Sequence, residues 1–578
     1  MKLIYLKEGR KYGVEKLRAC IFSQLDEADD DAKEVRNFFD KSKGGVPDAE
    51  VAKFFERFRT SLNDIKKAIA GDGKTIARKL KGGQYVFRYV GLYDYVDIGK
   101  DQDKCTGYNL TFFFMPKFID FNAETDYSGD VPEDGEDDSS LVAKGPTQDA
   151  IRAWKNRVDQ FASNKERNAV LLAIDRYNKE INRLGEQAEE TKWHEGLLEL
   201  AVRVLRDYLE NGIYTKQQRE LEHNGQGEID WETTIDQYQP VFLKGQDGRK
   251  RPVYMDMATE LANSDEDHYV TRLHKCLVTT WGRKLEELGL SSVLRVNVPL
   301  LTEDELAHLG TKEYQLDQIR KEMGVQFVTK SRHTLSLMKE LIERMSESQS
   351  TNDLCLSFGM NGAEHLWEAA CAEVLGSELE KPINKKGRGL SWPDKKTTFR
   401  DYMPRPIWTR ADNNGSAETL TEDIKAYERE SEKSGWRLDF IRTWPPKGQI
   451  EKLVIFDAKY YNVTWPKDGI LSGQPGIGDI AKQLFYQMAF EDLLLTKREG
   501  ADIGFVNAFL FPKDDGPSTD ISIGETVHLG WKDSTLTRKA VAFSGINLFT
   551  VYIPGIELLR RYASGEGADD WFKTIAEH

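Results

Sequence analysis

The stretch Leu453-Val454-Ile455-Phe456-Asp457-Ala458-Lys459-Tyr460-Tyr461 decides how the second half of the chain is expected to fold. Its apolar first part predicts a buried β-strand, and side chains along a strand alternate between the two faces of the sheet. Asp457 and Lys459 are therefore expected on the same face. A carboxylate and an ammonium at the end of an otherwise apolar strand are unusual in a plain core, so this pair is a candidate site.

The segments around this strand predict a mixed α/β sheet. Trp436–Arg442 is expected as a short strand, and Thr443–Gly448 has Pro and Gly where a turn needs them. Downstream, Gly478–Leu495 has the periodicity of a helix, while Ile503–Phe511 and Leu548–Ile553 are apolar strands. A hairpin followed by a helical crossover into a buried strand is typical of a mixed sheet flanked by helices.

Phosphodiester hydrolysis explains a carboxylate and a lysine in this position. Asp457 can bind Mg²⁺, which prefers carboxylate oxygens, polarises a phosphoryl oxygen and lowers the pKa of bound water. Lys459 can hold the attacking water and offset the charge that builds on the phosphate. The compact turn is expected to bring Asp439 beside Asp457, and Glu368, in a predicted helix with apolar neighbours, supplies a third acid. That helix also carries two alternatives to Glu368, namely Glu364 and Glu373.

The predicted metal ligands are Asp439, Asp457, the backbone carbonyl of Ala458 and Glu368, and the predicted ion is Mg²⁺, with Mn²⁺ as the alternative. Taken alone, Asp457 and Lys459 are equally well explained as a solvated ion pair on a surface strand. The apolar and aromatic residues on either side of the pair, and the second acid on the neighbouring strand, favour the nuclease interpretation. For Glu368 the ordinary alternative is an acid at the edge of an apolar stripe with its head group in water.

The length of 578 residues exceeds what one hydrophobic core accommodates, so several domains are expected. The predicted organisation, α+β overall, starts with an N-terminal α+β domain at 1–121 that contains a helix over Val51–Ala70. An acidic linker at 122–146, a mainly helical middle domain at 147–349 and a nuclease domain at 350–578 follow.

Cysteine usage and hydropathy exclude several protein classes. The five cysteines are scattered and form no C-x-x-C pair, which argues against a disulfide framework and a structural zinc site and favours a reducing cytoplasm. No run of about eighteen apolar residues is present, so no membrane span is expected. The apolar stretch that follows Met1 is too short and too charged for a secretory signal peptide.

The net charge of −15 argues at first sight against nucleic acid as a partner, but the charges are unevenly distributed. Residues 124–138 carry eight acids and no Lys or Arg, whereas Lys381–Arg400 is strongly basic and contains Trp392. Basic and aromatic side chains together suit a nucleic-acid strand. The predicted DNA-binding residues lie in this basic stretch, for which a solvated loop is the alternative: Lys385, Lys386, Arg388, Lys395 and Lys396.

The order of a helix Glu, then Asp, then Asp-x-Lys resembles the PD-(D/E)XK nuclease superfamily. The resemblance implies a C-terminal mixed sheet flanked by helices, with a further helix that places a Gln beside the catalytic strand. Gln483 and Gln487 lie four residues apart on one helix face and are predicted to serve this role. Two exposed helix glutamines are the alternative.

Two upstream segments, Tyr208–Tyr214 and Asn224-Gly225-Gln226-Gly227-Glu228-Ile229-Asp230-Trp231-Glu232-Thr233-Thr234-Ile235, carry a closer resemblance. Together with the later Asp-Ala-Lys they resemble the LlaJI family of restriction endonucleases, from about Leu197 to the end of the chain. In physical terms the second segment is expected as a Gly-rich turn followed by a strand, or as part of a core. No catalytic role is assigned to it.

The LlaJI family is similar to the nuclease subunits of the McrBC class, which work with a separate AAA+ GTPase. The resemblance therefore implies a bacterial, cytoplasmic restriction nuclease of anti-phage defence that acts on double-stranded DNA with an McrB-like GTPase. Dimerisation of two nucleases on the DNA is a further expectation. Gly71–Thr75 lacks the first glycine and the preceding strand of a phosphate-binding loop, so this chain is not expected to bind the nucleotide itself. A DNA-repair or replication nuclease, and a non-catalytic scaffold that retains the fold, stay open.

Overall fold

The computed structural model describes residues 3–12, 24, 77–79, 85–97, 109–119, 148–163, 165–184, 197–246, 248–265, 267–349, 353–383, 396–402, 438–463, 473–497, 503–514, 519–527, 530–532, 540–542 and 548–578. The chain forms two compact units. The smaller unit comprises residues 94–109 and 194–358, and the larger comprises 2–93, 110–193 and 359–578. This division differs from the expected boundaries because residues 148–184 belong to the same unit as the C-terminal sheet.

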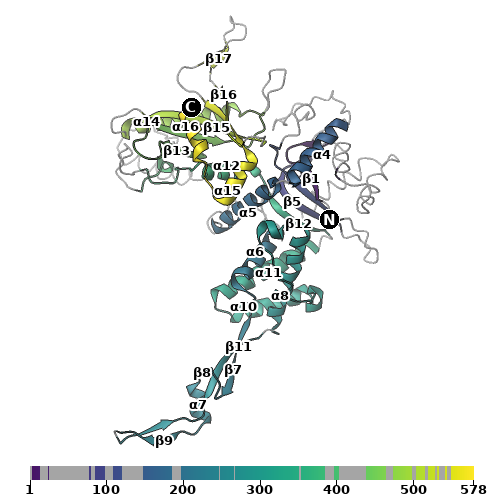
Figure 1. Ribbon diagram of the computed structural model, residues 1–578, viewed down its shortest axis with the longest axis vertical. Coiled ribbons are helices and arrows are strands. Elements are labelled where there is room, and N and C mark those ends of the chain that lie inside the picture. Colours follow the sequence, from purple (N-terminus) through teal and green to yellow (C-terminus); the bar gives the residue numbers. More distant parts are fainter. Residues whose placement is uncertain are drawn as a thin grey trace, which may run out of the picture. The chain divides into compact units, whose positions relative to one another are not determined.

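A five-stranded mixed sheet forms the C-terminal part of the larger unit (Figure 1). Its strands, in spatial order, are β13 (Phe440–Trp444), β14 (Lys452–Ala458), β15 (Gly504–Lys513), β19 (Leu548–Pro554) and β16 (Ser522–Val527). β13 is antiparallel to β14, β14 and β15 are parallel, and β19 is parallel to β15. The predicted hairpin, crossover helix and buried strands are confirmed, as is the α+β class.

Helices cover both faces of this sheet (Figure 1). On one face, α14 (Ile477–Lys497) packs Tyr486, Phe490 and Leu494 into an apolar core with Leu453 and Ile455 of β14. This face is the one from which Asp457 is expected to project, because 453, 455 and 457 share a side of the strand.

The opposite face of the sheet contacts the C-terminal helices α15 (Gly555–Ser564) and α16 (Asp569–Glu577) and the upstream helix α12 (Ala363–Val374). Phe572 of α16 lies with its ring centroid 6.2 Å from that of Phe456, and the Arg442 guanidinium lies 4.1 Å from the Phe572 ring. Phe456 therefore points away from α14, as the alternation along β14 requires.

The N-terminal strands belong to this larger unit. β1 (Leu3–Lys7) pairs in parallel with β6 (Asn109–Met115) in a sheet of order β1-β6-β5-β12. Its other strands, β5 (Tyr89–Asp97) and β12 (Asp353–Asn361), belong only in part to the larger unit, which includes β5 as far as Tyr93 and β12 from Gly359. Shorter elements complete the described part of the unit: β2 (Lys11–Tyr12), β3 (Ala77–Lys79), β4 (Tyr85–Phe87), β17 (Gly530–Lys532), β18 (Ala540–Ala542) and the 3₁₀ turn η4 (Arg400–Tyr402). The predicted helix over Val51–Ala70 and the acidic linker lie outside the described residues.

Two long helices tie the N-terminal and C-terminal segments of the larger unit together. α4 (Gln148–Ser163) carries Arg157, whose guanidinium pairs with the Asp514 carboxylate at 2.7 Å. α5 (Glu166–Leu184) packs on α15, where the Tyr562 hydroxyl donates to Glu180 Oε2 at 2.7 Å. The N-terminal segment is therefore part of the fold that carries the C-terminal sheet.

The smaller unit has a helical body. Its helices are α6 (Leu197–Asn211), α8 (Tyr269–Glu287), α9 (Ser291–Leu294), α10 (Lys312–Val325) and α11 (Thr329–Gln349), with the 3₁₀ turn η3 (Leu306–Leu309). The predicted end of α6 is confirmed: Gly212 adopts φ +77° and its N–H donates to the Tyr208 carbonyl at 2.8 Å. Among the described residues, no helix combines the length and apolar character needed to cross a bilayer.

An arm formed by residues 216–265 extends from this helical body (Figure 1). It contains β7 (Lys216–His223), β8 (Glu228–Ile229), α7 (Trp231–Gln237), β9 (Val241–Lys244), β10 (Lys250–Val253) and β11 (Ala258–Asp265). The expected Gly-rich turn and strand are confirmed only as far as β8, and the expectation is wrong beyond it because the following residues form the helix α7. Asp230 caps a helix by accepting from the Glu232 and Thr233 N–H groups, and Trp231 and Ile235 are 54% and 59% exposed.

The stability of the smaller unit should depend on pH through His274 of α8. This side chain is fully buried, and its Nδ1 accepts the Tyr214 N–H at 3.0 Å. Burial lowers the pKa of His274 to about 4, although Asp207 acts in the opposite direction. Because the folded pKa lies below the unfolded value of about 6.5, the folded state binds fewer protons and loses stability as pH falls through this interval.

Acidification from about pH 7 to about pH 4.5 should therefore lower the free energy of unfolding by roughly 2–3 kcal/mol through His274. Urea unfolding at both pH values would measure this loss. A His274→Gln variant should show a smaller loss over the same interval, and an unchanged loss in that variant would refute the assignment to His274.

Candidate active site at the end of strand β14

Asp439 and Asp457 lie side by side where β13 and β14 meet. Phe440 pairs with Phe456 in the antiparallel ladder, and extending this register by one residue sets Asp439 opposite Asp457. Asp439 Oδ2 accepts the backbone N–H of Ala458 at 2.6 Å. Asp439 itself stands just before the strand, which begins at Phe440 and therefore later than expected. The turn thus brings together the two predicted acids.

Lys459 follows the last residue of β14 and points to the same side as Asp457. Its ammonium lies 2.8 Å from Asp457 Oδ2 and 3.2 Å from Asp479 Oδ1, and the Lys459 side chain is only 18% exposed. Burial alone would lower the pKa of Lys459, but the two carboxylates outweigh burial and raise it above its ordinary value. Lys459 is therefore a fixed positive charge beside the acids.

Burial raises the pKa of both aspartates. For Asp439 the pKa is raised well above its usual range by burial first, then by the charges of Asp457 and Glu368. For Asp457 burial raises the pKa, while Lys459 acts in the opposite direction. A buried carboxyl group whose ionisation is disfavoured by a neighbouring carboxylate belongs to a site that a cation would stabilise.

Asp479 is a member of this cluster that the sequence reasoning missed. It lies in the first turn of α14, and its carboxylate forms the second contact of the Lys459 ammonium. The sequence shows the helical periodicity of 478–495, but the predicted site residues of this helix, Gln483 and Gln487, lie further along it. An acid in the first turn of the crossover helix after an Asp-x-Lys strand was the available signal.

Gln483 and Gln487 face the sheet. They are 1% and 6% exposed, so the alternative of two exposed glutamines is wrong. Asn507 of β15 donates to the Gln483 carbonyl at 3.0 Å and to Gln487 Oε1 at 3.2 Å, and Gln487 Nε2 donates to Glu491 at 2.8 Å. These contacts fix α14 against β15. A direct part in the chemistry stays a prediction for both glutamines.

The three acids of α12 take different positions. Glu373 pairs with Arg176, and Glu364 acts electrostatically on Glu8 and Tyr460. Glu368 raises the pKa of Asp439, but its side chain is 42% exposed and lies 3.7 Å from His365 Nδ1. Of the three, Glu368 is thus the one whose charge reaches Asp439, while its role as a metal ligand stays a prediction.

The donor set fits a hard divalent cation held by few protein ligands. Within the described residues, no group of three or more His, Cys, Asp or Glu side chains is arranged to hold a metal. Two adjacent, mostly buried carboxylates are nevertheless what Mg²⁺ commonly uses, since it keeps several of its waters. Asp439 and Asp457 supply them, and Ala458, whose carbonyl is the predicted third ligand, lies between Asp457 and Lys459.

Most of the predicted DNA-binding residues cannot be placed. Lys385, Lys386, Arg388 and Lys395 lie outside the described residues, while Lys396 is described and exposed. Lys396 lies before the short turn η4, which begins at Arg400. Arg400 forms an ion pair with Glu380. The basic stretch as a DNA contact stays a prediction.

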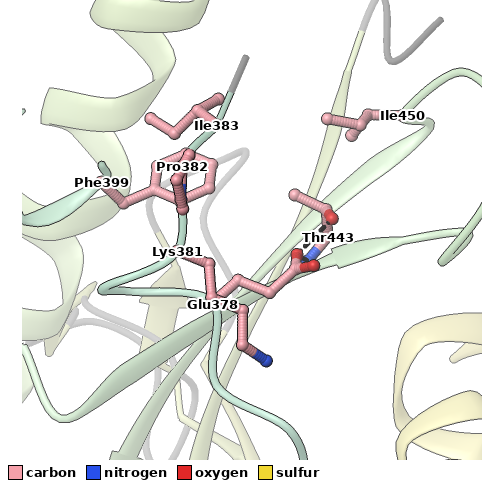
Figure 2. A pocket seen from close by; sticks show the side chains of 7 residues that line it. All are labelled: Glu378, Lys381, Pro382, Ile383, Phe399, Thr443 and Ile450. Carbon is pink, nitrogen blue, oxygen red and sulfur yellow. Dashed lines mark hydrogen bonds between the residues drawn. The ribbon is translucent and has the colours of Figure 1, made fainter. Parts of the chain in front are cut away.

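A separate pocket lies at the far end of β13 and β14 from the aspartates. Glu378, Lys381, Pro382, Ile383, Phe399, Thr443 and Ile450 line it. Figure 2 shows the Glu378 carboxylate turned toward Thr443, whose backbone N–H donates to it at 2.9 Å. None of the predicted catalytic residues lines this pocket, so the candidate active site is defined by the acids and the lysine instead.

The similarity of this chain to known proteins covers the residues of the candidate active site. The sequence model of the LlaJI restriction endonuclease family matches residues 186–533, a range that includes Asp439, Asp457, Lys459 and Asp479. A Bacillus subtilis (strain 168) protein, the Type II restriction enzyme BsuMI component YdjA, is 27% identical over 373 residues. The similarity covers 63% of this chain and 66% of the relative, so the chain spans slightly under two thirds of that protein.

Proposed function

The chain belongs to the LlaJI restriction endonuclease family, and on this premise we propose that it is the metal-dependent DNA-cleaving component of a restriction system. The observation that carries the proposal is the cluster of Asp439, Asp457 and Lys459, held where two strands of a mixed sheet meet. The resemblance to PD-(D/E)XK nucleases, noted in the order of these residues, supports the same chemistry.

In this proposal each residue of the cluster has a distinct task. Asp439 and Asp457 hold Mg²⁺ or Mn²⁺ together with the Ala458 carbonyl, and Glu368 assists. The bound ion supplies Lewis acidity and a water of lowered pKa. Lys459, fixed between Asp457 and Asp479, orients the attacking water and offsets the negative charge that develops on the phosphate. Gln483 and Gln487 hold α14 in place behind the site.

Double-stranded DNA is the proposed substrate, and an McrB-like AAA+ GTPase is the proposed partner. The relative from Bacillus subtilis is named as a component of a restriction enzyme, which supports action within a multi-component system. Two copies meeting on the DNA would allow both strands to be cut.

Plasmid cleavage by the purified chain, with Mg²⁺ or EDTA and with or without the partner GTPase and GTP, tests this function. We expect cleavage that requires the metal and is lost in Lys459→Ala. Cutting that also requires partner and GTP would support the motor-dependent system. Absence of cutting by folded protein with its partner, across methylated and unmethylated substrates, would refute the nuclease proposal.

Asp479→Asn should lower the cleavage rate by roughly 10-fold, because the Lys459 ammonium loses one of the two carboxylates that fix it. Asp479→Glu, which keeps the charge, should recover part of the rate. Single-turnover cleavage would compare both variants with Glu557→Gln, which alters an acid held by Arg560 and Arg561 of α15. A full rate in Asp479→Asn would remove Asp479 from the site.

A further inference from the structure

Glu8, Lys117 and Tyr460 meet inside the larger unit, one residue beyond the proposed catalytic lysine. The Tyr460 hydroxyl donates to Glu8 Oε2 at 2.7 Å. The backbone N–H of Lys117 is shared between Glu8 Oε2 and the Tyr460 hydroxyl, at 3.3 Å from each. The Lys117 ammonium lies 4.3 Å from the centre of the Tyr460 ring. Residues from both ends of the chain thus converge on one side chain.

The Glu8 and Tyr460 side chains are nearly closed to water, whereas Lys117 is partly exposed. Glu8 is 6% exposed and Tyr460 is 4% exposed. Burial raises the pKa of Glu8, although Lys117 and the Tyr460 hydroxyl act in the opposite direction. A buried carboxyl is costly unless its hydrogen bonds are made, so the Tyr460 hydroxyl and Glu8 hold each other in one geometry.

The Tyr460 ring is fixed on its other sides as well. Its centroid lies 6.2 Å from that of Phe118 and 6.4 Å from that of Trp367. The Trp367 indole N–H donates to the Leu510 carbonyl at 3.3 Å, and the Lys459 backbone N–H donates to the same oxygen at 2.9 Å. The Lys459 backbone and Trp367, whose ring packs near Tyr460, are therefore held by the same carbonyl of β15.

Because side chains alternate along a strand, the position of the Tyr460 ring bears on the position of the neighbouring Lys459 side chain. Tyr460 points toward the N-terminal segment and α12, whereas Lys459 points toward Asp457 and Asp479. β14 ends at Ala458, and the bond from the Lys459 N–H to the Leu510 carbonyl is the last ladder bond to β15, so beyond this residue the chain is held by the Tyr460 side chain. The orientation of Lys459 then depends on where the ring of Tyr460 is held.

We propose that Glu8 and Tyr460 are positioning residues for Lys459. The N-terminal segment that carries β1 and β6 thereby contributes to the geometry of the nuclease site. This inference rests on the proposed function and extends it to Glu8 and the N-terminal segment, which lie outside the region matched by the family, since that region begins at residue 186. Glu8 follows β1 directly and Lys117 follows β6, and the parallel pairing of these strands brings both to Tyr460. The role of the N-terminal segment is therefore to set the geometry of Lys459.

The test compares Tyr460→Phe and Glu8→Gln with Tyr562→Phe in the full-length chain. Tyr562 is a suitable control, because its side chain is buried and its hydroxyl donates to Glu180 at the same 2.7 Å. This bond ties α15 to α5 and does not support β14. We expect Tyr460→Phe to lower kcat for DNA cleavage by roughly 10-fold with little change in KM. The Glu8→Gln/Tyr460→Phe double variant should lose no more than the larger single loss, because the two groups act as a pair.

A second readout does not depend on cleavage. Amide hydrogen exchange at Lys459, whose N–H is bonded to Leu510, should be several-fold faster in Tyr460→Phe than in Tyr562→Phe. Wild-type kcat and unchanged exchange in Tyr460→Phe, or equal losses in Tyr460→Phe and Tyr562→Phe, would overturn the positioning role. A wild-type chain that never cleaves DNA would overturn the proposed function instead, and the exchange comparison would then decide the positioning role alone.

Discussion

Asp457→Asn should lower the rate of DNA cleavage by at least about 10³-fold while the chain stays folded. Asparagine has the shape of aspartate but no negative charge, so the variant removes the charge that would hold the divalent cation. A loss of this size corresponds to about 4 kcal/mol of transition-state stabilisation. It is large because Asp457 contacts both the proposed ion site and Lys459, whose ammonium lies 2.8 Å away.

The stability of Asp457→Asn should change little. The substitution removes one partner of Lys459, but the ammonium keeps its contact with Asp479 at 3.2 Å. It also removes a charge that raises the pKa of Asp439, so the buried Asp439 carboxyl is relieved of that repulsion. These two effects oppose each other, and urea unfolding in EDTA should give a midpoint close to that of the wild type.

Asp514→Asn is the matched control for this prediction. Asp514 forms an ion pair with Arg157 at 2.7 Å and is 18% exposed, close to the 13% of Asp457. Its substitution breaks a comparable pair between α4 and the segment after β15 and should leave the cleavage rate near that of the wild type. Single-turnover cleavage of a plasmid measures both rates. If the two variants cleaved equally well, Asp457 would have no special place in the chemistry.

Much of the C-terminal sheet could be predicted because its signals are local. Three features each predict the structure of the segment in which they occur: the apolar run before Asp457, the Pro- and Gly-containing turn and the helical periodicity after residue 478. They lead to strand, hairpin and crossover without long-range information. The pairing of Asp439 with Asp457 followed from the turn length alone. The start of β13 at Phe440 instead of Trp436 is the ordinary uncertainty of an element boundary.

Two parts of the site could not be predicted in the same way. Glu8 and Tyr460 are 452 residues apart, and no periodicity relates a residue after β1 to one after β14. Asp479 was visible as an acid in a helix, but its contact with Lys459 depends on how α14 returns across the sheet. The arm shows the opposite case, because Asp230 is a local sequence signal for the start of a helix, although the segment is expected to be a strand.

Lys459→Met should lower the cleavage rate by roughly 10²–10³-fold and, unlike Asp457→Asn, should also destabilise the chain. Methionine preserves much of the apolar length of the side chain, so the packing loss is small. The variant leaves Asp439, Asp457 and Asp479 together without the ammonium that offsets them. Breaking such an ion pair in a mostly buried place should cost roughly 2–4 kcal/mol of unfolding free energy, since Lys459 is 18% exposed.

The same variant makes a distinguishing prediction about the metal. Without Lys459 the acids carry more uncompensated negative charge, so Mg²⁺ should stabilise the variant more than the wild type. Thermal unfolding in EDTA and in increasing Mg²⁺ would measure the two shifts, with Asp514→Asn again as the control. A larger shift in Lys459→Met, with cleavage still lost, would mean that the ion site survives and that the lysine acts on the reaction itself. If Mg²⁺ stabilised Lys459→Met and the wild type equally, Asp439 and Asp457 would not be the residues that hold the ion, and the proposed metal site would have to be abandoned.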